Sequence, residues 1–181
     1  MEIKMEVKAK CVYDYESIKA LTYLLVYKGK EPTKRFIMLN VWYGFLFFIT
    51  ILMFVNSGMN IYNIITFSVL VFCICIIYRI HYSSPKKRYN ALCKMRDIEQ
   101  NYIFCDEVIK ISLDSEYYKG EAELKYSMIP KIMETSKFFF IYRDNTNIYI
   151  VDKTTISGGT QKEIREKFKE VLKDNYKVCK Y

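Results

Sequence analysis

Between Phe36 and Tyr78 the chain contains no Lys, Arg, Asp, Glu or His, although 27% of its 181 residues are charged. This window holds two apolar runs, Phe36 to Val55 and Ile61 to Tyr78, which only the polar turn NSGMN separates. At about 1.5 Å of rise per residue, each run forms a helix of roughly 27 to 30 Å, which matches the hydrocarbon core of a bilayer. The pattern therefore predicts a transmembrane helical hairpin.

The alternative is a pair of core helices in a soluble domain. A soluble helix of this length normally carries a polar stripe, and neither run has one. We do not expect a cleaved signal peptide, because the first run starts after 35 residues and a second run follows at once. The polar residues of the runs are uncharged and scattered, and they could form hydrogen bonds across the helix pair. These residues are Asn40, Thr50, Asn63, Thr66 and Ser68.

Basic residues gather at the two ends of the predicted hairpin. Together with one acid, Glu31, they give these flanks a net charge of +7, out of +8 for the whole chain. Positive charge beside membrane spans stays in the cytoplasm, so we expect both termini there and the turn at residues 56–60 outside. The same residues are expected to contact anionic lipid headgroups. We call them the basic collar: Lys28, Lys30, Lys34, Arg35, Arg79, Lys86, Lys87 and Arg88.

The cytoplasmic parts flank the hairpin, and the chain divides into four segments. Residues 1–35 are predicted to form a strand, whose apolar residues alternate from Ile3 to Cys11, and an amphipathic helix that Asp14 caps. Such a strand needs partner strands elsewhere in the chain. Residues 36–80 form the hairpin. Residues 81–97 are predicted to form a separate linker helix, with Ser84 as its N-cap and Pro85 at its first position.

The fourth segment, residues 98–181, is predicted to be a cytoplasmic domain of short strands that ends in a helix. Thr160 and Glu163 form a capping box, and an apolar stripe of Ile164, Phe168, Val171 and Leu172 follows. We expect an α+β fold in which this helix closes an antiparallel sheet or partial barrel. The predicted strands are residues 101–105, 108–113, 121–126, 131–135, 137–143 and 147–152, with an edge strand at 116–119.

One stretch of this domain carries a recognisable pattern. Lys125 to Ser157 reads KYSMIPKIMETSKFFFIYRDNTNIYIVDKTTIS, in which a strand, an I-x-K-I-x-E-T segment and an aromatic strand follow one another. A segment similar to I-I-P-K-R comes next and reads Ile150-Val151-Asp152-Lys153-Thr154, without the proline and the arginine. With its order of elements, the chain resembles the YcxB-like proteins of bacteria. The resemblance implies a pleckstrin-homology-like (PH-like) domain on a two-span hairpin in the bacterial inner membrane, and no reaction.

The residues point to binding rather than catalysis. No motif predicts a catalytic, cofactor-binding or metal-binding residue. The only histidine, His81, is expected to be solvated at the membrane interface. We do not expect nucleic-acid binding, because the charge outside these flanks, with Glu31 counted among them, amounts to only +1. The sequence thus predicts a non-enzymatic, membrane-anchored module that binds a protein or lipid, with an unknown membrane protein as a possible partner.

Two alternatives to this function remain open. A membrane-associated enzyme would require the carboxylates of Asp106, Glu107, Asp114 and Glu116 to converge on one pocket. A homo-oligomeric transport component would require several hairpins to build a pore, because two uncharged spans alone offer no ion pathway. The acidic turn at residues 105–107 argues against a specific phosphoinositide site, since it repels phosphate.

Overall fold

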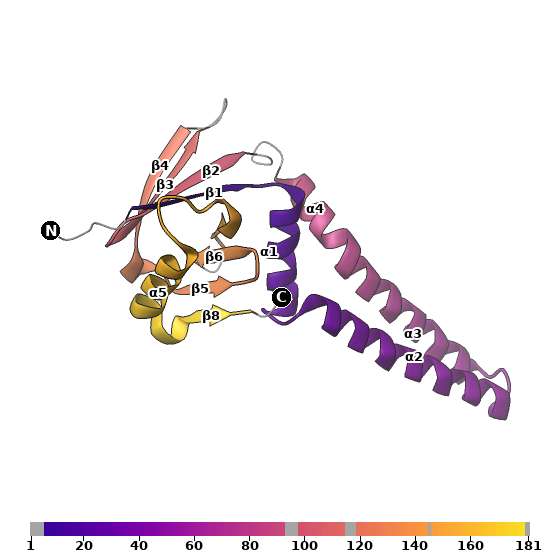
Figure 1. The fold of residues 1–181 in the computed structure, drawn as a ribbon. Helices are drawn as coiled ribbons and strands as arrows, with labels where there is room; N and C mark the ends of the chain where they lie inside the picture. Colours follow the sequence, from indigo (N-terminus) through magenta and orange to yellow (C-terminus); the bar gives the residue numbers. More distant parts are fainter. Residues whose placement is uncertain (1–5, 93–97, 115–118, 145, 180–181) are drawn as a thin grey trace.

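The structure is a computed structural model that describes residues 6–92, 98–114, 119–144 and 146–179 (Figure 1). It combines a hairpin of two long helices with a mixed α/β domain, and a short helix from the N-terminal segment lies where the two parts meet.

Two four-stranded sheets form the domain, rather than the single sheet expected from the sequence. The first sheet is antiparallel in the order β1-β2-β3-β4 and consists of β1 (Val7–Val12), β2 (Glu99–Phe104), β3 (Val108–Asp114) and β4 (Lys119–Lys125). The second has the order β7-β6-β5-β8 and consists of β5 (Lys131–Glu134), β6 (Phe138–Tyr142), β7 (Ile148–Asp152) and β8 (Tyr176–Val178). In the part of the chain that the structure describes, the sheets do not close into a barrel.

The N-terminal strand belongs to the same core as the C-terminal segment. Val7, Ala9 and Cys11 are buried along β1, in the alternation that the sequence predicts. Strand β1 pairs antiparallel with β2, which supplies the partner strand that the pattern requires. Lys8 also forms a two-bond bridge with Ser157, so β1 links the first sheet to the chain that follows β7.

Most of the predicted strands are present, with ends shifted by one or two residues. Residues 116–118 of the expected edge strand lie outside the described residues, and Lys119 begins β4. Strand β8 was not predicted. It pairs parallel with β5, so the second sheet is mixed rather than antiparallel.

Helix α5 (Gln161–Leu172) fills the end of the domain between the two sheets. The capping box is confirmed: the Glu163 N–H donates to Thr160 Oγ1 and the Thr160 N–H donates to Glu163 Oε2, both at 3.2 Å. Ile164, Phe168 and Leu172 are buried, but Val171 is exposed, contrary to the predicted stripe. The Phe168 ring contacts aromatic rings from both sheets and the segments beside them. These are Phe104, Tyr126, Phe139 and Tyr176.

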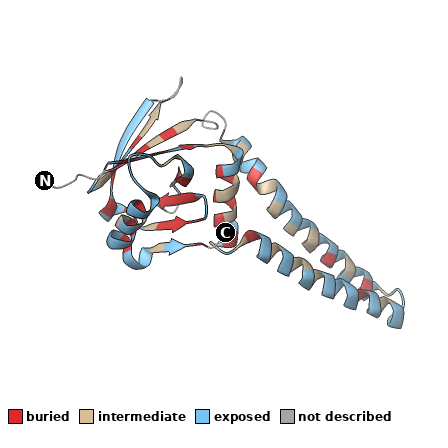
Figure 2. Cartoon of the chain, in the orientation of Figure 1, coloured by how far each residue is buried: buried red, intermediate tan, exposed pale blue. Residues whose placement is uncertain are grey.

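The hairpin consists of α2 (Pro32–Ser57) and α3 (Ile61–Tyr78), and both helices are long and apolar enough to cross a membrane. Its side chains are largely exposed (Figure 2). In the most apolar stretch of each helix, only 6% and 11% of the residues are buried. Core helices of a soluble domain would be buried on at least one face, so this exposure fits a lipid-facing hairpin.

Only one polar side chain joins the two arms of the hairpin. Asn63 Nδ2 donates to the Gly58 carbonyl at 2.9 Å and to the Met53 carbonyl at 3.5 Å. The other polar residues, which could also have bonded across the helix pair, bond within their own helix, to the carbonyl four residues earlier. They are Asn40, Thr50, Thr66 and Ser68.

The helix of the second arm continues beyond the apolar run. A π-helical segment, η1 (Arg79–Ser83), joins α3 directly to α4 (Ser84–Ala91), so a helix of 31 residues runs from Ile61 to Ala91. The prediction that Ser84 caps a separate linker helix is therefore wrong: Ser83 and Ser84 have helical backbones, and no side chain caps α4. The π segment ends two residues before Pro85, whose missing N–H interrupts the hydrogen-bond pattern of a helix.

Candidate functional site

Helix α1 (Tyr15–Tyr27) connects the domain to both arms of the hairpin. The arms meet at the turn near Gly58 and separate toward the domain, where α1 lies across the gap (Figure 1). It packs along α4 and also contacts α2. Asp14 caps its start by accepting from the Ser17 N–H at 2.7 Å, and Lys28 ends it in the left-handed conformation. Both caps fix α1 at the length that spans the gap.

An aromatic cluster around His81 holds α1 against the two arms. The His81 ring stacks on Tyr23 of α1, with the ring centres 5.0 Å apart, and on Phe36 of α2 at 4.1 Å. The Tyr27 hydroxyl is hydrogen-bonded to His81 Nδ1 at 2.6 Å. The expected solvated histidine is thus half-buried and connects three helices. We call these four residues the histidine clamp.

A pocket of about 270 Å³ lies beside this junction, between α1, α4, β2 and the β6–β7 turn. Its apolar wall consists of Ile18, Leu21, Leu92 and Ile148. Two arginines from distant parts of the chain line it as well, Arg88 of α4 and Arg143 directly after β6, and none of its lining residues in the described part of the chain is acidic. We call it the arginine pocket. Its remaining lining residues are polar: Tyr13, Gln100, Thr146, Asn147 and Tyr149.

Hydrogen bonds order the polar side of the arginine pocket. The Gln100 Oε1 atom accepts from the hydroxyls of Tyr13 at 2.9 Å and Tyr102 at 2.7 Å. Burial raises the pKa of both tyrosines, so both hydroxyls stay protonated and keep donating. Because its oxygen is used in this way, the Gln100 side chain has a fixed orientation.

The carboxylate nearest in sequence to Arg143 is engaged elsewhere. Asp144 Oδ1 accepts from the backbone N–H groups of Thr146 and Asn147, each at 2.7 Å, and Asn147 Nδ2 donates to the other oxygen. These hydrogen bonds, first of all that from the Asn147 side chain, hold the pKa of Asp144 well below its usual range. Asp144 therefore stabilises its own turn, and in the described part of the chain neither Arg88 nor Arg143 forms an ion pair.

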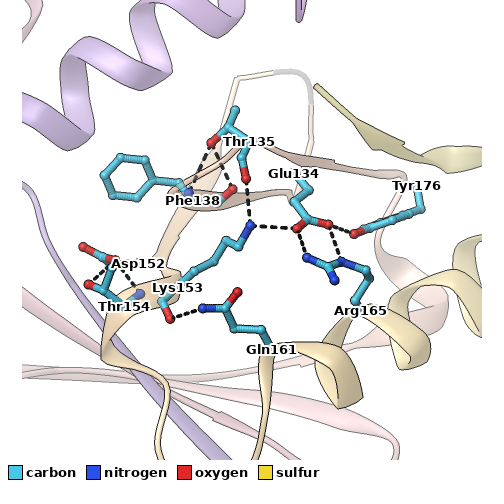
Figure 3. A network of polar contacts seen from close by, with 9 residues as sticks. All are labelled: Glu134, Thr135, Phe138, Asp152, Lys153, Thr154, Gln161, Arg165 and Tyr176. Carbon is cyan, nitrogen blue, oxygen red and sulfur yellow. Dashed lines mark hydrogen bonds and ion pairs between the residues drawn. The ribbon is translucent and has the colours of Figure 1, made fainter. Parts of the chain in front are cut away.

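A second polar cluster lies inside the domain, around the buried carboxylate of Glu134 (Figure 3). Lys153 Nζ donates to Glu134 Oε1 at 2.7 Å and to the Thr135 carbonyl at 2.9 Å. Arg165 of α5 binds both carboxylate oxygens, at 2.5 and 3.0 Å, and the Tyr176 hydroxyl donates to Oε2. We call this set the Glu134 network, and it ties β5, α5 and β8 together.

The electrostatics of the Glu134 network indicate a structural role. Burial alone raises the pKa of Glu134, but the hydrogen bonds from Arg165, Lys153 and Tyr176 outweigh it and hold the pKa at about 2. Its side chain is only 3% exposed. A carboxylate that is ionised, buried and fully hydrogen-bonded has no free position for a substrate.

The carboxylates proposed for an enzyme converge only in part. Asp106 and Glu107 line one open pocket of about 360 Å³, together with Cys105, Val108 and Lys110. The side chains of Asp114 and Glu116 lie outside the described residues. Within residues 6–92, 98–114, 119–144 and 146–179, no three His, Cys, Asp or Glu side chains are placed to hold a metal ion.

The basic collar surrounds the junction, mainly as exposed side chains. Lys28 and Lys30 lie in the turn between α1 and α2, and Lys34 and Arg35 lie in the first turns of α2. Lys34 pairs with Glu31 at 2.8 Å. The rest of the collar follows α3, with Arg79 in η1 and three members in α4, of which only Arg88 enters the arginine pocket. The other two are Lys86 and Lys87.

No known protein family matches the sequence, and no curated protein or solved structure is significantly similar to it. The site must therefore be judged from its own geometry. The sequence identified Arg88 only as one member of the collar and did not identify Arg143, Tyr23 or Tyr27. A signal was present, because Arg143 directly follows a strongly aromatic strand and begins a turn, where loop residues commonly carry function.

Proposed function

We propose that the chain is an integral membrane protein whose two-span hairpin anchors a binding domain at the cytoplasmic face of a bacterial inner membrane. The observation that carries this proposal is the histidine clamp. It fastens α1, and through α1 the domain, to both arms of a hairpin whose surface is apolar. A domain held this way has a fixed orientation, which suits the presentation of a binding surface to a partner or ligand.

Membership of the YcxB-like family, with a PH-like domain, is part of this proposal. Its support comes from the two motif segments of the resemblance. Glu134 is the acid of the I-x-K-I-x-E-T segment, and Lys153 is the lysine of the segment similar to I-I-P-K-R. The two side chains pair at 2.7 Å, and both are almost fully buried. A motif built on such a pair is expected in proteins that share a packing arrangement.

Cysteine labelling in intact cells tests the orientation. In a background with the six native cysteines replaced, Met59→Cys marks the turn of the hairpin and Lys162→Cys marks α5. Both positions are exposed. A membrane-impermeant maleimide is expected to label residue 59 in intact cells and residue 162 only after lysis. Labelling of residue 162 in intact cells, with residue 59 protected, would reverse the orientation. Extraction of the protein by carbonate would refute the spanning hairpin.

In-cell photo-crosslinking of the full-length protein tests the binding role. A photoreactive residue at position 143 lies at the mouth of the arginine pocket, and one at position 162 serves as the matched control on exposed α5. The proposal expects one reproducible adduct from position 143 that position 162 does not give. The same pattern of adducts from both positions would mean that this surface has no specific partner.

A further inference from the structure

We propose that the arginine pocket binds a small, water-soluble molecule that carries a phosphate or carboxylate group beside an apolar portion. This inference deepens the proposed function, because it names the class of ligand that the anchored domain would take. The chemistry of the pocket stands on its own residues, whereas the source of the ligand depends on the orientation of the hairpin.

Two positive side chains from independent elements line one concave site. Arg88 projects from α4, and Arg143 follows β6, where its N–H donates to the Asn147 carbonyl at 3.0 Å and so fixes the turn. Asp144, the acid next to Arg143 in the sequence, is held by its own turn. A guanidinium presents its donors in a planar fork that matches phosphate and carboxylate oxygens. Among the described residues neither guanidinium has an ion-pair partner and no acid lines the pocket, so the two arginines favour binding of an anion.

The other walls of the pocket determine what accompanies the anionic group. Ile18, Leu21, Leu92 and Ile148 form an apolar surface opposite the polar residues. The volume of about 270 Å³ lies near the lower end of the range for small-molecule pockets, roughly 300 to 1,000 Å³. An inorganic anion would leave the apolar wall in contact with water. A molecule the size of an aromatic or short aliphatic phosphate would cover it.

The position along the helix favours a ligand from the aqueous phase over a bilayer lipid. Arg79 is the first charge after the second apolar run, and Arg88 lies nine residues further along the same continuous helix. At 1.5 Å per residue, this separation is about 13 Å. The headgroup layer on each side of a bilayer is only roughly 5 to 8 Å thick. A phospholipid would therefore have to leave its layer to reach the pocket.

Calorimetric titration of the full-length protein in neutral detergent micelles tests the inference. Phenyl phosphate is the probe, and inorganic phosphate, which has no apolar group, is the comparison ligand. We expect saturable binding of phenyl phosphate with a dissociation constant in the millimolar range or below, and binding of inorganic phosphate at least fivefold weaker. The double variant R88Q/R143Q should weaken phenyl phosphate binding at least tenfold. The matched variant K86Q/K87Q makes the same change in net charge on exposed α4 residues and should remain within twofold of the wild type.

Three results would overturn the inference. No saturable binding to the wild type would refute the site, and equal weakening by both double variants would reduce it to long-range attraction. Displacement of phenyl phosphate by phosphatidylglycerol mixed into the micelles, but not by phosphatidylcholine, would make the ligand a lipid headgroup. All four positions are exposed, so the variants should fold, and unchanged thermal midpoints would verify this. Because the titration needs no bilayer, its failure is distinct from a failure of the labelling experiment.

Discussion

The Lys153 ammonium lies 2.7 Å from a carboxylate oxygen of Glu134, and the two side chains are only 6% and 3% exposed. They come from different elements: Glu134 ends β5 and Lys153 begins a short 3₁₀ helix after β7. Because Arg165 and Tyr176 bind the same carboxylate, one buried charge connects the second sheet to α5 and to the C-terminal strand. Loss of any one of these partners should therefore destabilise the whole domain.

The first prediction concerns pH. The unfolded Glu134 carboxyl gains its proton near its ordinary pKa of 4.5, whereas the folded carboxyl gains it only at about 2. Its ionised form therefore stabilises the fold fully above pH 4.5, and this contribution, on the order of 3 kcal/mol, is lost as the pH falls toward 2. We expect the difference in free energy of unfolding between wild type and Glu134→Gln to shrink between about pH 6 and about pH 3. Denaturant titrations in detergent micelles measure it, and a constant difference would contradict the prediction.

The second prediction concerns the partner lysine. Lys153→Met removes the ammonium and leaves a buried carboxylate with two partners, which should destabilise the domain by about 3 to 5 kcal/mol. The control is Lys162→Met on α5, because Lys162 is 80% exposed and its pairing with Glu166 is solvated. Its effect should be below about 0.5 kcal/mol. The thermal unfolding midpoints of the wild type and the two variants test this prediction. Similar midpoints for both variants would mean that the buried ion pair does not stabilise the domain.

The third prediction concerns the turn between α1 and α2. Gly29 has a φ of +75°, and a Cβ atom there would lie 2.5 Å from Met133 Cε and 2.8 Å from Cys179 Sγ. Gly29→Ala should destabilise the protein by more than about 1 kcal/mol, through both the backbone conformation and the contacts. Gly120→Ala is the control, since a Cβ atom there meets nothing within 4 Å. Unfolding of the two variants at the same temperature would mean that this turn does not pack closely on the second sheet.

The fourth prediction concerns the histidine clamp. Tyr27→Phe keeps the ring but removes the hydroxyl that is bonded to His81, which should cost about 1 kcal/mol. Faster hydrogen exchange in α1 should accompany the lower stability. Tyr82→Phe is the matched control, because the Tyr82 ring also packs against His81, at 4.8 Å, while its hydroxyl forms no hydrogen bond in the described part of the chain. Equal exchange rates in both variants would argue against the clamp.

Features that depend on neighbouring residues could be predicted from the sequence. The two long apolar helices follow from a window without charge, and the capping box of α5 follows from Thr160 and Glu163 alone. The period of two along β1 correctly gave its buried face. In each case the physical cause lies within a few residues of its effect.

Features that depend on distant contacts could not be predicted. Strand β8 has only three residues, too few for a periodic signal, and it exists because it pairs with β5 some forty positions earlier. His81 looked solvated because its partners on α1 are more than fifty residues away in the sequence. The arginine pocket combines Arg88 and Arg143 in the same way. The Ser84-Pro85 pair was misleading for another reason, since the same residues can begin a helix or follow a π segment.

With the hairpin in a bilayer, as we propose, the unbroken helix from Ile61 to Ala91 would make the protein sensitive to the thickness of that bilayer. A spanning helix that does not match the hydrocarbon core adjusts chiefly by tilting. Here α4 continues that helix and packs along α1, so the domain must turn whenever the hairpin leans. A change in lipid composition that alters the bilayer thickness would then change the tilt of the domain. The opening of the arginine pocket would move closer to the membrane surface or farther from it.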